Sequence, residues 1–372
     1  MKYLRAVLGA LALISLSAPA QELRIGLTGP QTGPAAFLGQ HMKWGGELAV
    51  DEINAKGGVL GRKVKLVFYD SGCRPADAVS ATERLLGQDA VDIMLADLCS
   101  GATLAEMPLV EKANRPMLVS IASSPEITKR SGANGNKWVF RIVPDDETMT
   151  AAAASQMQGY GKIALLAEDT DYGRASAQTL KARLGNSNFI SEDFVKPTEN
   201  DFLAFLSKVR ASKPDAIAVY LLDQQMLNLM KQYMQFGLNA PFIGRPVMVT
   251  PAAAELLKTR KFEGSWAVAQ YFESYNVPGN VAFAKAYKAR FGENPHYVGY
   301  GVYEGIMVAA DAVRRAGSTD PEAVRKALAA TNYKGLLGDT LSFNQFNQPA
   351  NSTVLRLIVK NGVLQVERIA GN

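Results

Sequence analysis

The segment Leu98-Cys99-Ser100-Gly101-Ala102-Thr103 is the stretch from which the fold of this chain can be worked out. It follows an apolar run at residues 91–96 and precedes a helical pattern, which together predict a strand that turns directly into a helix. The same arrangement returns further along, where an apolar run at residues 116–119 leads into Ser120-Ile121-Ala122-Ser123-Ser124-Pro125-Glu126. Two turns of this kind indicate neighbouring strands of one parallel sheet.

The two serine-containing turns are candidates for a binding site. Neighbouring strand-to-helix turns meet at the carboxyl edge of a parallel sheet, where free backbone N–H groups and serine hydroxyls can hold an anion. The sequence therefore predicts an anion-binding edge that includes Ser100 and Ser123. The alternative is that Ser100, Ser123 and Ser124 only cap helices, as serine very often does.

Strand and helix patterns alternate on both sides of these turns. A first series predicts strands at residues 23–27, 64–69, 91–98 and 116–120 and helices at 39–54, 76–86 and 103–113. A second series predicts strands at 138–143, 163–167, 216–222 and 242–244 and helices at 149–158, 173–184, 202–211 and 224–235. Helices at 281–291 and 300–316 follow without a strand between them, and 354–360 with 363–368 form a hairpin around Asn361-Gly362. This order predicts an α/β fold with parallel, doubly wound sheets, and the chain length favours two lobes.

The N-terminus predicts export from the cytoplasm. Lys2 and Arg5 form a basic start, residues 6–16 are apolar, and Ala18-Pro19-Ala20 is a small-x-small cleavage site. We therefore expect residues 1–20 to be a cleaved signal peptide. Its apolar core is too short to span a membrane, and no later stretch reaches the roughly 18 apolar residues that a spanning helix needs. No cysteine stands at the cleavage site to carry a lipid, so we expect free export to the periplasm.

Charge and composition argue against nucleic acid as a partner. The formal net charge is +5, and removal of the signal peptide with Lys2 and Arg5 lowers it to +3 over the whole mature chain. The sequence has no block of like charges and no alternation of basic and aromatic residues that would follow a phosphate backbone.

The chain has two cysteines, Cys73 and Cys99. Because an exported protein folds in an oxidising compartment, we expect them to form a disulfide. Two free buried thiols are the alternative. A metal site is less favoured, since two distant cysteines with no nearby histidine do not have the spacing of zinc ligands.

Signatures of catalysis are sparse. The two histidines, His41 and His296, are far apart in sequence and are expected to lie at the surface or to pack between lobes. The chain has no nucleophile elbow and no phosphate-binding loop. The glycines at 299, 301 and 305 miss the dinucleotide fingerprint by one position, so we interpret them as helix packing. We expect no enzyme activity, no cofactor and no metal.

Several segments resemble one known family. The N-terminal matches are Leu23-Arg24-Ile25-Gly26-Leu27, Thr32-Gly33-Pro34 and the run from Asp51 to Arg62, DEINAKGGVLGR. Further matches are Tyr69-Asp70-Ser71-Gly72-Cys73, Leu98 to Thr103, Pro125-Glu126-Ile127-Thr128, Asp171-Tyr172-Gly173 and Tyr303-Glu304-Gly305. Together they resemble the periplasmic solute-binding proteins of the branched-chain amino acid and amide family over essentially the whole mature chain.

The resemblance implies the type I periplasmic binding fold, with two Rossmann-like lobes joined by three crossing segments and a ligand in the cleft between them. Residues 21–143 and about 272–350 would form lobe 1, and residues 144–271 and about 351–372 would form lobe 2. The segments that contain Cys73 and Cys99 match the two disulfide segments of that family.

The resemblance also implies a set of ligand-binding positions. Ser100, Ala122 and Ser123 match positions that hold a ligand carboxylate through hydroxyls and backbone N–H groups. Tyr172 matches an aromatic residue of the second lobe that closes over the ligand, with lobe packing as the alternative. Leu38 stands where amino acid binders often place a large apolar residue.

Two positions depart from the pattern of amino acid binders. Arg245-Pro246 follows the strand at 242–244, where those proteins commonly carry an acid that pairs with the ligand ammonium. Leu221-Leu222-Asp223 stands where they often have a tyrosine. An unpaired buried ammonium costs several kcal/mol, so the missing acid argues against an ordinary amino acid unless Asp223 replaces it. Arg245 suits a carboxylate, or it points to solvent.

These observations predict an exported, monomeric solute receptor that closes about a hinge and delivers a small carboxylate-bearing ligand to permease subunits of an ABC transporter. The ligand would be an aromatic acid, a keto acid, a dicarboxylate or an atypical amino acid. The alternatives are a branched-chain amino acid or amide binder with another ammonium partner, a sensor that reports to a membrane receptor, and an exported hydrolase.

Overall fold

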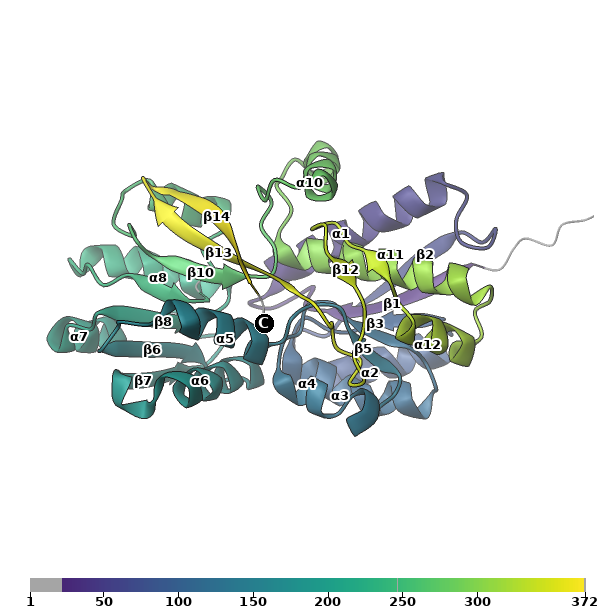
Figure 1. Ribbon diagram of the computed structural model, residues 1–372, viewed down its shortest axis with the longest axis horizontal. Coiled ribbons are helices and arrows are strands. Elements are labelled where there is room, and N and C mark those ends of the chain that lie inside the picture. Colours follow the sequence, from purple (N-terminus) through teal and green to yellow (C-terminus); the bar gives the residue numbers. More distant parts are fainter. Residues whose placement is uncertain (1–21, 246, 371–372) are drawn as a thin grey trace, which may run out of the picture.

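The computed structural model describes residues 22–245 and 247–370, which form two lobes side by side (Figure 1). Lobe 1 is built on a five-stranded sheet and lobe 2 on a four-stranded sheet. The strand pairs in both sheets are parallel. The expected α/β architecture with two Rossmann-like lobes is therefore confirmed, while the predicted signal peptide at residues 1–20 lies outside the described residues.

The lobe 1 sheet has the strand order β2-β1-β3-β4-β5, in which the chain winds first one way and then the other from β1. Its strands are β1 (Leu23–Gly29), β2 (Val64–Asp70), β3 (Ile93–Leu95), β4 (Met117–Val119) and β5 (Val139–Arg141). Its helices are α1 (Ala36–Ala55), α2 (Pro75–Gly87), α3 (Ser100–Lys112), α4 (Pro125–Lys129), α10 (Pro278–Phe291), α11 (Tyr297–Ala316) and α12 (Pro321–Ala329). A short 3-10 helix, η1 (Gly132–Asn134), and the two-stranded β11 (Tyr333–Lys334) and β12 (Thr340–Leu341) complete this lobe.

The lobe 2 sheet has the order β7-β6-β8-β9. Its strands are β6 (Ile163–Glu168), β7 (Phe189–Val195), β8 (Ala216–Tyr220) and β9 (Phe242–Gly244). Its helices are α5 (Asp146–Gln156), α6 (Asp171–Leu184), η2 (Asn186–Asn188), α7 (Leu203–Ser212), α8 (Asp223–Gln235) and α9 (Pro251–Leu257). An antiparallel sheet of β10 (Trp266–Ala269), β13 (Thr353–Lys360) and β14 (Val363–Ala370) packs beside it and includes the predicted C-terminal hairpin.

Strand β7 was not predicted from the sequence. Its first four residues alternate between partly buried and exposed positions, its last three are all partly buried, and Glu192 and Asp193 interrupt the apolar pattern. The strand lies at the edge of the sheet, where one side faces solvent and polar residues are tolerated. The alternation of apolar and polar residues is weak in this segment, so its strand conformation depends on the pairing with β6.

The chain crosses between the lobes three times, after β5, after β10 and before β13 (Figure 1). The crossing segments therefore include Ile142–Pro144, the residues after Ala269 and the residues before Thr353. These segments lie together on one side of the junction, so they are placed to act as a hinge.

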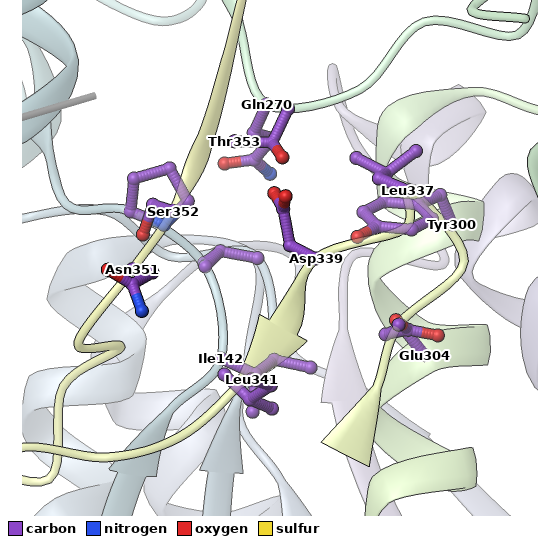
Figure 2. Close-up of a pocket in the computed structure, with 13 residues that line it drawn as sticks. Ile142, Gln270, Tyr300, Glu304, Leu337, Asp339, Leu341, Asn351, Ser352 and Thr353 are labelled. Carbon is purple, nitrogen blue, oxygen red and sulfur yellow. The ribbon is translucent and has the colours of Figure 1, made fainter. Parts of the chain in front are cut away.

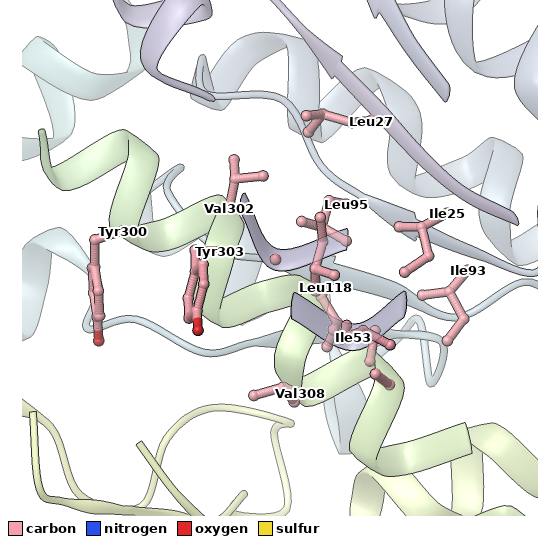
Figure 3. Packing of buried hydrophobic residues seen from close by; sticks show 14 of the residues in the cluster. Ile25, Leu27, Ile53, Ile93, Leu95, Leu118, Tyr300, Val302, Tyr303 and Val308 are labelled. Carbon is pink, nitrogen blue, oxygen red and sulfur yellow. The ribbon is translucent and has the colours of Figure 1, made fainter. Parts of the chain in front are cut away.

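The core of lobe 1 lies between its sheet and helices α1 and α11 (Figure 3). Ile25, Leu95 and Leu118 from neighbouring strands pack against Val302 and Ile306 of α11. The two helices come so close that a Cβ atom on Gly45 of α1 would overlap the carbonyl group of Gly299 in α11. Gly299 thus serves helix packing, as the sequence predicted. Gly301 and Gly305 instead let α11 approach the sheet, since a Cβ atom there would lie 2.4 Å from the Ser120 carbonyl oxygen or 2.9 Å from Leu95 Cδ2.

The glycine-rich turn after α1 requires backbone conformations with positive φ. Gly58 has φ of +80°, and a Cβ atom there would overlap the carbonyl of Arg62.

In the described residues, no helix is both long and apolar enough to cross a membrane.

Candidate functional site

One contact between the lobes brings the start of helix α3 in lobe 1 close to the start of helix α6 in lobe 2. A Cβ atom on Gly101 of α3 would lie 2.8 Å from Oδ2 of Asp171 in α6. Glycine at position 101 therefore allows the close approach of the lobes at this point.

The serine-containing turns of lobe 1 lie side by side, as the sequence predicted. Ser100 and Ser123 are both about 95 % buried, at 5 % exposure each. The Ser124 N–H donates to Ser100 Oγ at 3.2 Å, so a hydrogen bond joins the two turns. Ser124 Oγ accepts from the Glu126 N–H at 3.3 Å, which makes Ser124 the N-cap of α4. The capping alternative therefore applies to Ser124, whereas Ser100 bonds across to the neighbouring turn.

A buried arginine that sequence reasoning missed holds the second turn in place. Arg141, at the end of β5, is fully buried and donates from Nη1 to the Ala122 carbonyl at 2.8 Å and from Nη2 to the Ser124 carbonyl at 2.7 Å. Because the guanidinium binds these two carbonyl oxygens, the groups of the turn that can bind another partner are its backbone N–H donors. Burial lowers the pKa of Arg141 from its ordinary value.

From lobe 2, Arg245 forms a buried ion pair with Asp146 at the start of α5. The Asp146 side chain is fully buried and that of Arg245 is 13 % exposed, so the alternative that Arg245 points to solvent is wrong. Burial raises the pKa of Asp146 despite the nearby guanidinium. Burial alone would lower the pKa of Arg245, but the Asp146 carboxylate leaves it above its ordinary value.

Aromatic residues surround this ion pair. The Arg245 guanidinium carbon lies 5.4 Å from the ring centre of Tyr172, and the Tyr172 and Tyr220 rings are 6.4 Å apart. Tyr172 is the second residue of α6 and is partly buried, while Tyr220 ends β8 and is fully buried. Burial raises the pKa of both phenols, so each keeps its proton and can donate a hydrogen bond. Tyr297, at the start of α11 in lobe 1, is close enough to Tyr172 and Arg245 for their charges to affect its pKa, which burial raises.

A hydrogen bond between His296 and Asp223 joins the lobes. Nε2 of His296, which precedes α11 in lobe 1, lies 2.9 Å from Oδ1 of Asp223, the first residue of α8 in lobe 2. Both residues are 5 % exposed. His41 lies behind His296, with its ring 5.4 Å away, and burial lowers the pKa of His41 to about 4, so it is neutral. Packing between the lobes is therefore correct for His296, whereas the ring neighbours of His41 all lie in lobe 1. Neither histidine lies at the surface.

Glu168 ends β6 close to Asp223 and is 3 % exposed. Burial raises the pKa of Glu168 to about 7, although the nearby Leu222 N–H and Thr170 hydroxyl act in the opposite direction. Its carboxyl group is thus protonated in acid and only partly ionised at neutral pH.

Two of the predicted ligand-binding residues lie in hydrophobic cores. Leu38 on α1 is 2 % exposed and belongs to the lobe 1 cluster, and Leu221 is fully buried in the lobe 2 cluster. The neighbouring Leu222 is partly buried and packs against the lobe 1 cluster, so it reaches across the junction. No sequence pattern separates Leu221 from Leu222, because the turn into α8 decides which of them faces the other lobe.

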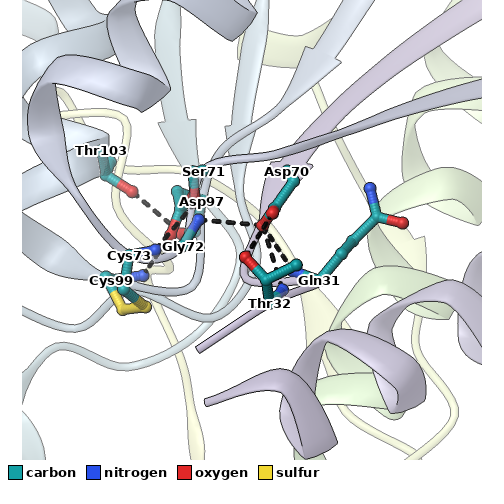
Figure 4. The surroundings of a disulfide bond; sticks show 9 residues. All are labelled: Gln31, Thr32, Asp70, Ser71, Gly72, Cys73, Asp97, Cys99 and Thr103. Atoms are coloured by element: carbon teal, nitrogen blue, oxygen red, sulfur yellow. Dashed lines mark hydrogen bonds between the residues drawn. A yellow bond between two sulfur atoms is a disulfide. The ribbon is translucent and has the colours of Figure 1, made fainter. Parts of the chain in front are cut away.

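The expected disulfide between Cys73 and Cys99 is present, with its Cα atoms 5.4 Å apart (Figure 4). It ties the turn after β2 to the turn that precedes Ser100. Asp97 supports both turns, because Oδ2 accepts from Ser71 Oγ at 2.5 Å and Oδ1 accepts from the Cys99 N–H at 2.7 Å. Burial raises the pKa of Asp97 to about 6. Of the described residues, Cys73, Asp97 and Cys99 are the one cluster of three potential metal ligands, and the disulfide leaves them no thiol for a metal.

A model of the family described as "Periplasmic binding protein" matches residues 22–362. The chain belongs to this family. Periplasmic binding proteins of this kind are solute-binding components of transporters and not enzymes, so the expected family and the general role of solute binding are confirmed.

Curated relatives of this periplasmic binding protein include amino acid binders. The "Leucine-, isoleucine-, valine-, threonine-, and alanine-binding protein" of Pseudomonas aeruginosa is 29 % identical over 89 % of this chain and 88 % of its own. The "Leu/Ile/Val-binding protein" of Escherichia coli K12 is 27 % identical over 89 % of both chains.

Solved structures with the same fold contain different ligands. A solute-binding protein of an ABC transporter from R. palustris, in complex with benzoate, has a TM-score of 0.84 at 20 % identity and covers 94 % of this chain and 98 % of its own. The branched-chain amino acid transporter substrate-binding protein LivJ of Streptococcus pneumoniae, in complex with isoleucine, also has a TM-score of 0.84, at 23 % identity over 94 % of this chain and 100 % of its own. At these identities the likeness establishes the fold alone.

Proposed function

We propose that this chain captures a small organic acid without an α-ammonium group and delivers it to the permease subunits of an ABC transporter. Aromatic acids are the favoured class, followed by keto acids and dicarboxylates. The observation that carries this proposal is the pairing of the lobe 2 acids, because Asp146 is paired with Arg245 and Asp223 with His296. Each acid therefore already has a partner at Oδ1, while Asp146 Oδ2 and Asp223 Oδ2 have no hydrogen-bond partner among the described residues. An ammonium group would have to compete with Arg245 and His296 for these two carboxylates.

The serine-containing turns are proposed to hold the ligand carboxylate. The backbone N–H side of the turn at Ala122 and Ser123, the Ser123 hydroxyl and the Ser100 hydroxyl supply donors at the carboxyl edge of the lobe 1 sheet. Arg141 keeps the carbonyls of this turn engaged, which leaves donors and not acceptors for an anion.

Arg245 and Tyr172 are proposed to bind the other end of the ligand. With the guanidinium 5.4 Å from the Tyr172 ring, this part of lobe 2 offers an aromatic surface and hydrogen-bond donors together. Tyr220 and Tyr297 extend the surface, and their protonated phenols also suit an acceptor. Neighbouring structures with benzoate and with 3,4-dihydroxybenzoic acid show that proteins of this fold can hold an aromatic acid.

A branched-chain amino acid is the second candidate. The names of the curated relatives favour it, and Glu168 would supply the ammonium partner in its ionised form. Against it stands the burial of Glu168, which raises the pKa of this carboxyl group to about 7 and so reduces its charge at neutral pH. Leu38 and Leu221 favour neither class of ligand, because both side chains lie in hydrophobic cores.

Binding is proposed to close the lobes about the three crossing segments. Lobe 1 would comprise residues 21–143 and about 272–350, and lobe 2 residues 144–271 and about 351–372. The protein would act as a monomer in the periplasm, with no catalytic role. Delivery to a transporter is favoured over sensing by the family's role in transport, although both would use the same closure.

Titration calorimetry with the mature protein tests this proposal. Benzoate, 3,4-dihydroxybenzoate, 4-methyl-2-oxopentanoate, succinate and leucine would be compared in one buffer. We expect an acid without an ammonium group to bind at least tenfold more tightly than leucine, and tight binding of leucine alone would overturn the proposal. A paired variant, Arg245→Gln with Asp146→Asn, removes the ion pair without leaving a buried charge and should weaken the preferred acid at least tenfold.

A further inference from the structure

Two acids and an imidazole are buried together where helix α11 of lobe 1 meets the end of β6 and the start of α8 in lobe 2. Glu168 ends β6, Asp223 begins α8 and His296 directly precedes α11. Their exposed fractions are 3 %, 5 % and 5 %. The 2.9 Å bond to His296 Nε2 gives Asp223 a partner from the other lobe. No ion pair of Glu168 is found in residues 22–245 and 247–370, although acids are almost never fully buried without a partner.

Lobe 1 takes part in the burial of Glu168. The Leu222 N–H and the Thr170 hydroxyl lie beside the Glu168 carboxyl group, and the Leu222 side chain packs against the hydrophobic core of lobe 1. Burial raises the pKa of Tyr297 in the first turn of α11, and the nearby Asp223 and Glu168 raise it further. Separation of the lobes would therefore withdraw α11 from Glu168 and let water reach its carboxyl group.

The other titratable groups of the junction do not balance the charge of Glu168. Those near Glu168, Asp223 or His296, or next to these neighbours, are His41, Tyr172, Arg245, Glu273, Lys288, Glu293 and Tyr297. Burial lowers the pKa of His41 to about 4 and raises the pKa of both tyrosines, so these three are neutral. Arg245 is paired with Asp146, and Lys288 is exposed. Two carboxylates therefore face one imidazole when Glu168 is ionised, and one carboxylate faces it when Glu168 is protonated.

Helix α11 also contacts the hinge, one to about two turns beyond His296. Tyr300 and Glu304 of this helix line a cavity of about 50 Å³ together with Gln270 and Thr353 of two crossing segments (Figure 2). The same helix therefore adjoins the crossing segments and carries the lobe 1 side of the junction. An opening rotation of lobe 2 about the crossing segments would move Asp223 away from His296 and expose the neighbouring acid.

We propose that closure of the lobes takes up a proton, which Glu168 holds at the junction, and that solute capture is therefore favoured in mildly acidic solution. The proton comes from the solvent and converts the carboxylate of Glu168 to a carboxyl group, so that Asp223 alone remains charged opposite His296. In the open form, water would solvate the Glu168 carboxylate and return its pKa toward the ordinary value of 4.5. With a pKa of about 7 in the buried arrangement, the extra stability of the closed form is fully present below about pH 4.5 and is lost as pH rises through about 7. Proton uptake requires the lobe closure proposed above, but it does not depend on the class of solute.

Titration calorimetry at pH 6 and pH 8 tests this coupling with whichever of benzoate, 3,4-dihydroxybenzoate, 4-methyl-2-oxopentanoate, succinate and leucine binds most tightly. We expect about tenfold higher affinity at pH 6, and uptake of about 0.5 proton per solute at pH 7, obtained from the heats in buffers of different ionisation enthalpy. Equal affinity at both pH values, or tighter binding at pH 8, would overturn the proposal. Leucine as the tightest ligand would overturn the proposed preference for acids, but proton uptake would be measured with it in the same way.

Glu168→Gln connects the pH effect to this carboxyl group, because the amide keeps the shape of the side chain and does not ionise. Its affinity should differ by less than about twofold between pH 6 and pH 8, and a full tenfold difference would overturn the role of Glu168. Glu304→Gln is the matched control. The Glu304 carboxyl group is also buried with a pKa of about 7, but it accepts from the Leu336 N–H within lobe 1, so the tenfold difference should remain.

Two further measurements keep the proposal testable if a variant or a ligand fails. If Glu168→Gln does not fold, the absence of proton uptake by the unmodified protein would overturn the proposal. If none of the five compounds binds, small-angle scattering of the protein without solute should show a smaller radius of gyration at pH 6 than at pH 8. Equal radii would then overturn the proposal.

Discussion

Asp223 and His296, which are separated by 73 residues in the chain, form a 2.9 Å hydrogen bond that joins lobe 2 to lobe 1. The bond is buried at both ends. The hydrogen bond forms only when the two lobes have this relative position, because each lobe supplies one of its two side chains.

Replacement of His296 by phenylalanine should therefore weaken ligand binding while leaving each lobe folded. The ring would still pack against Phe37 and His41, but Asp223 would lose its partner at the junction. The loss of one buried hydrogen bond costs about 1 to 3 kcal/mol, and 1.4 kcal/mol corresponds to about tenfold in affinity. Calorimetry measures this affinity, and small-angle scattering should show a larger radius of gyration at equal ligand concentration. Glu192→Gln, which breaks a pair with Lys181 inside lobe 2, should have neither effect.

The double variant Ser100→Ala and Ser123→Ala should weaken binding of a carboxylate ligand at least tenfold. Each hydroxyl would donate to a charged group, and such hydrogen bonds contribute about 1.5 to 3 kcal/mol. The matched control is Ser124→Ala, which removes the N-cap of α4 and should lower the free energy of unfolding by about 1 kcal/mol with little change in affinity. Unchanged affinity in the double variant would mean that these serines serve only the structure of the turns.

Glu168→Gln should change how stability depends on pH. Burial raises the pKa of Glu168 in the folded state to about 7, above its unfolded value of about 4.5. The folded protein therefore binds this proton more tightly, and the resulting stability is full below pH 4.5 and is lost as pH rises to about 7. The loss is at most about 3 kcal/mol. Urea unfolding at pH 4.5 and pH 8 should give a smaller difference for Glu168→Gln than for the unmodified protein, and identical differences would contradict the raised pKa.

Removal of the disulfide by Cys73→Ser with Cys99→Ser should lower the free energy of unfolding by about 3 to 4 kcal/mol, since the bond closes a loop with a sequence separation of 26. Denaturant unfolding of the variant measures this loss. Unmodified protein treated with a strong reductant should behave like the variant. A reduced protein as stable as the oxidised one would show that the packing around Asp97 maintains the turns without the bond.

Local sequence patterns determined much of the fold. Apolar runs followed by polar turns located β1, β2, β4, β6, β8 and β9, and Asn361-Gly362 located the C-terminal hairpin. Export and cysteine count predicted the disulfide between Cys73 and Cys99, which the structure contains. These features could be predicted because the periodicity of strands and helices and the residue preferences of turns are local properties of the sequence.

The contacts at the junction of the lobes were decided only by the tertiary structure. Arg245 could be singled out as a departure from amino acid binders, but its partner Asp146 lies 99 residues away and belongs to another helix. The bond between Asp223 and His296 and the support of the serine turn by Arg141 likewise depend on which strand ends and helix starts come together. A periodic pattern records which face of an element is buried, but the pairing of polar groups across two lobes depends on the arrangement of elements that are distant in sequence.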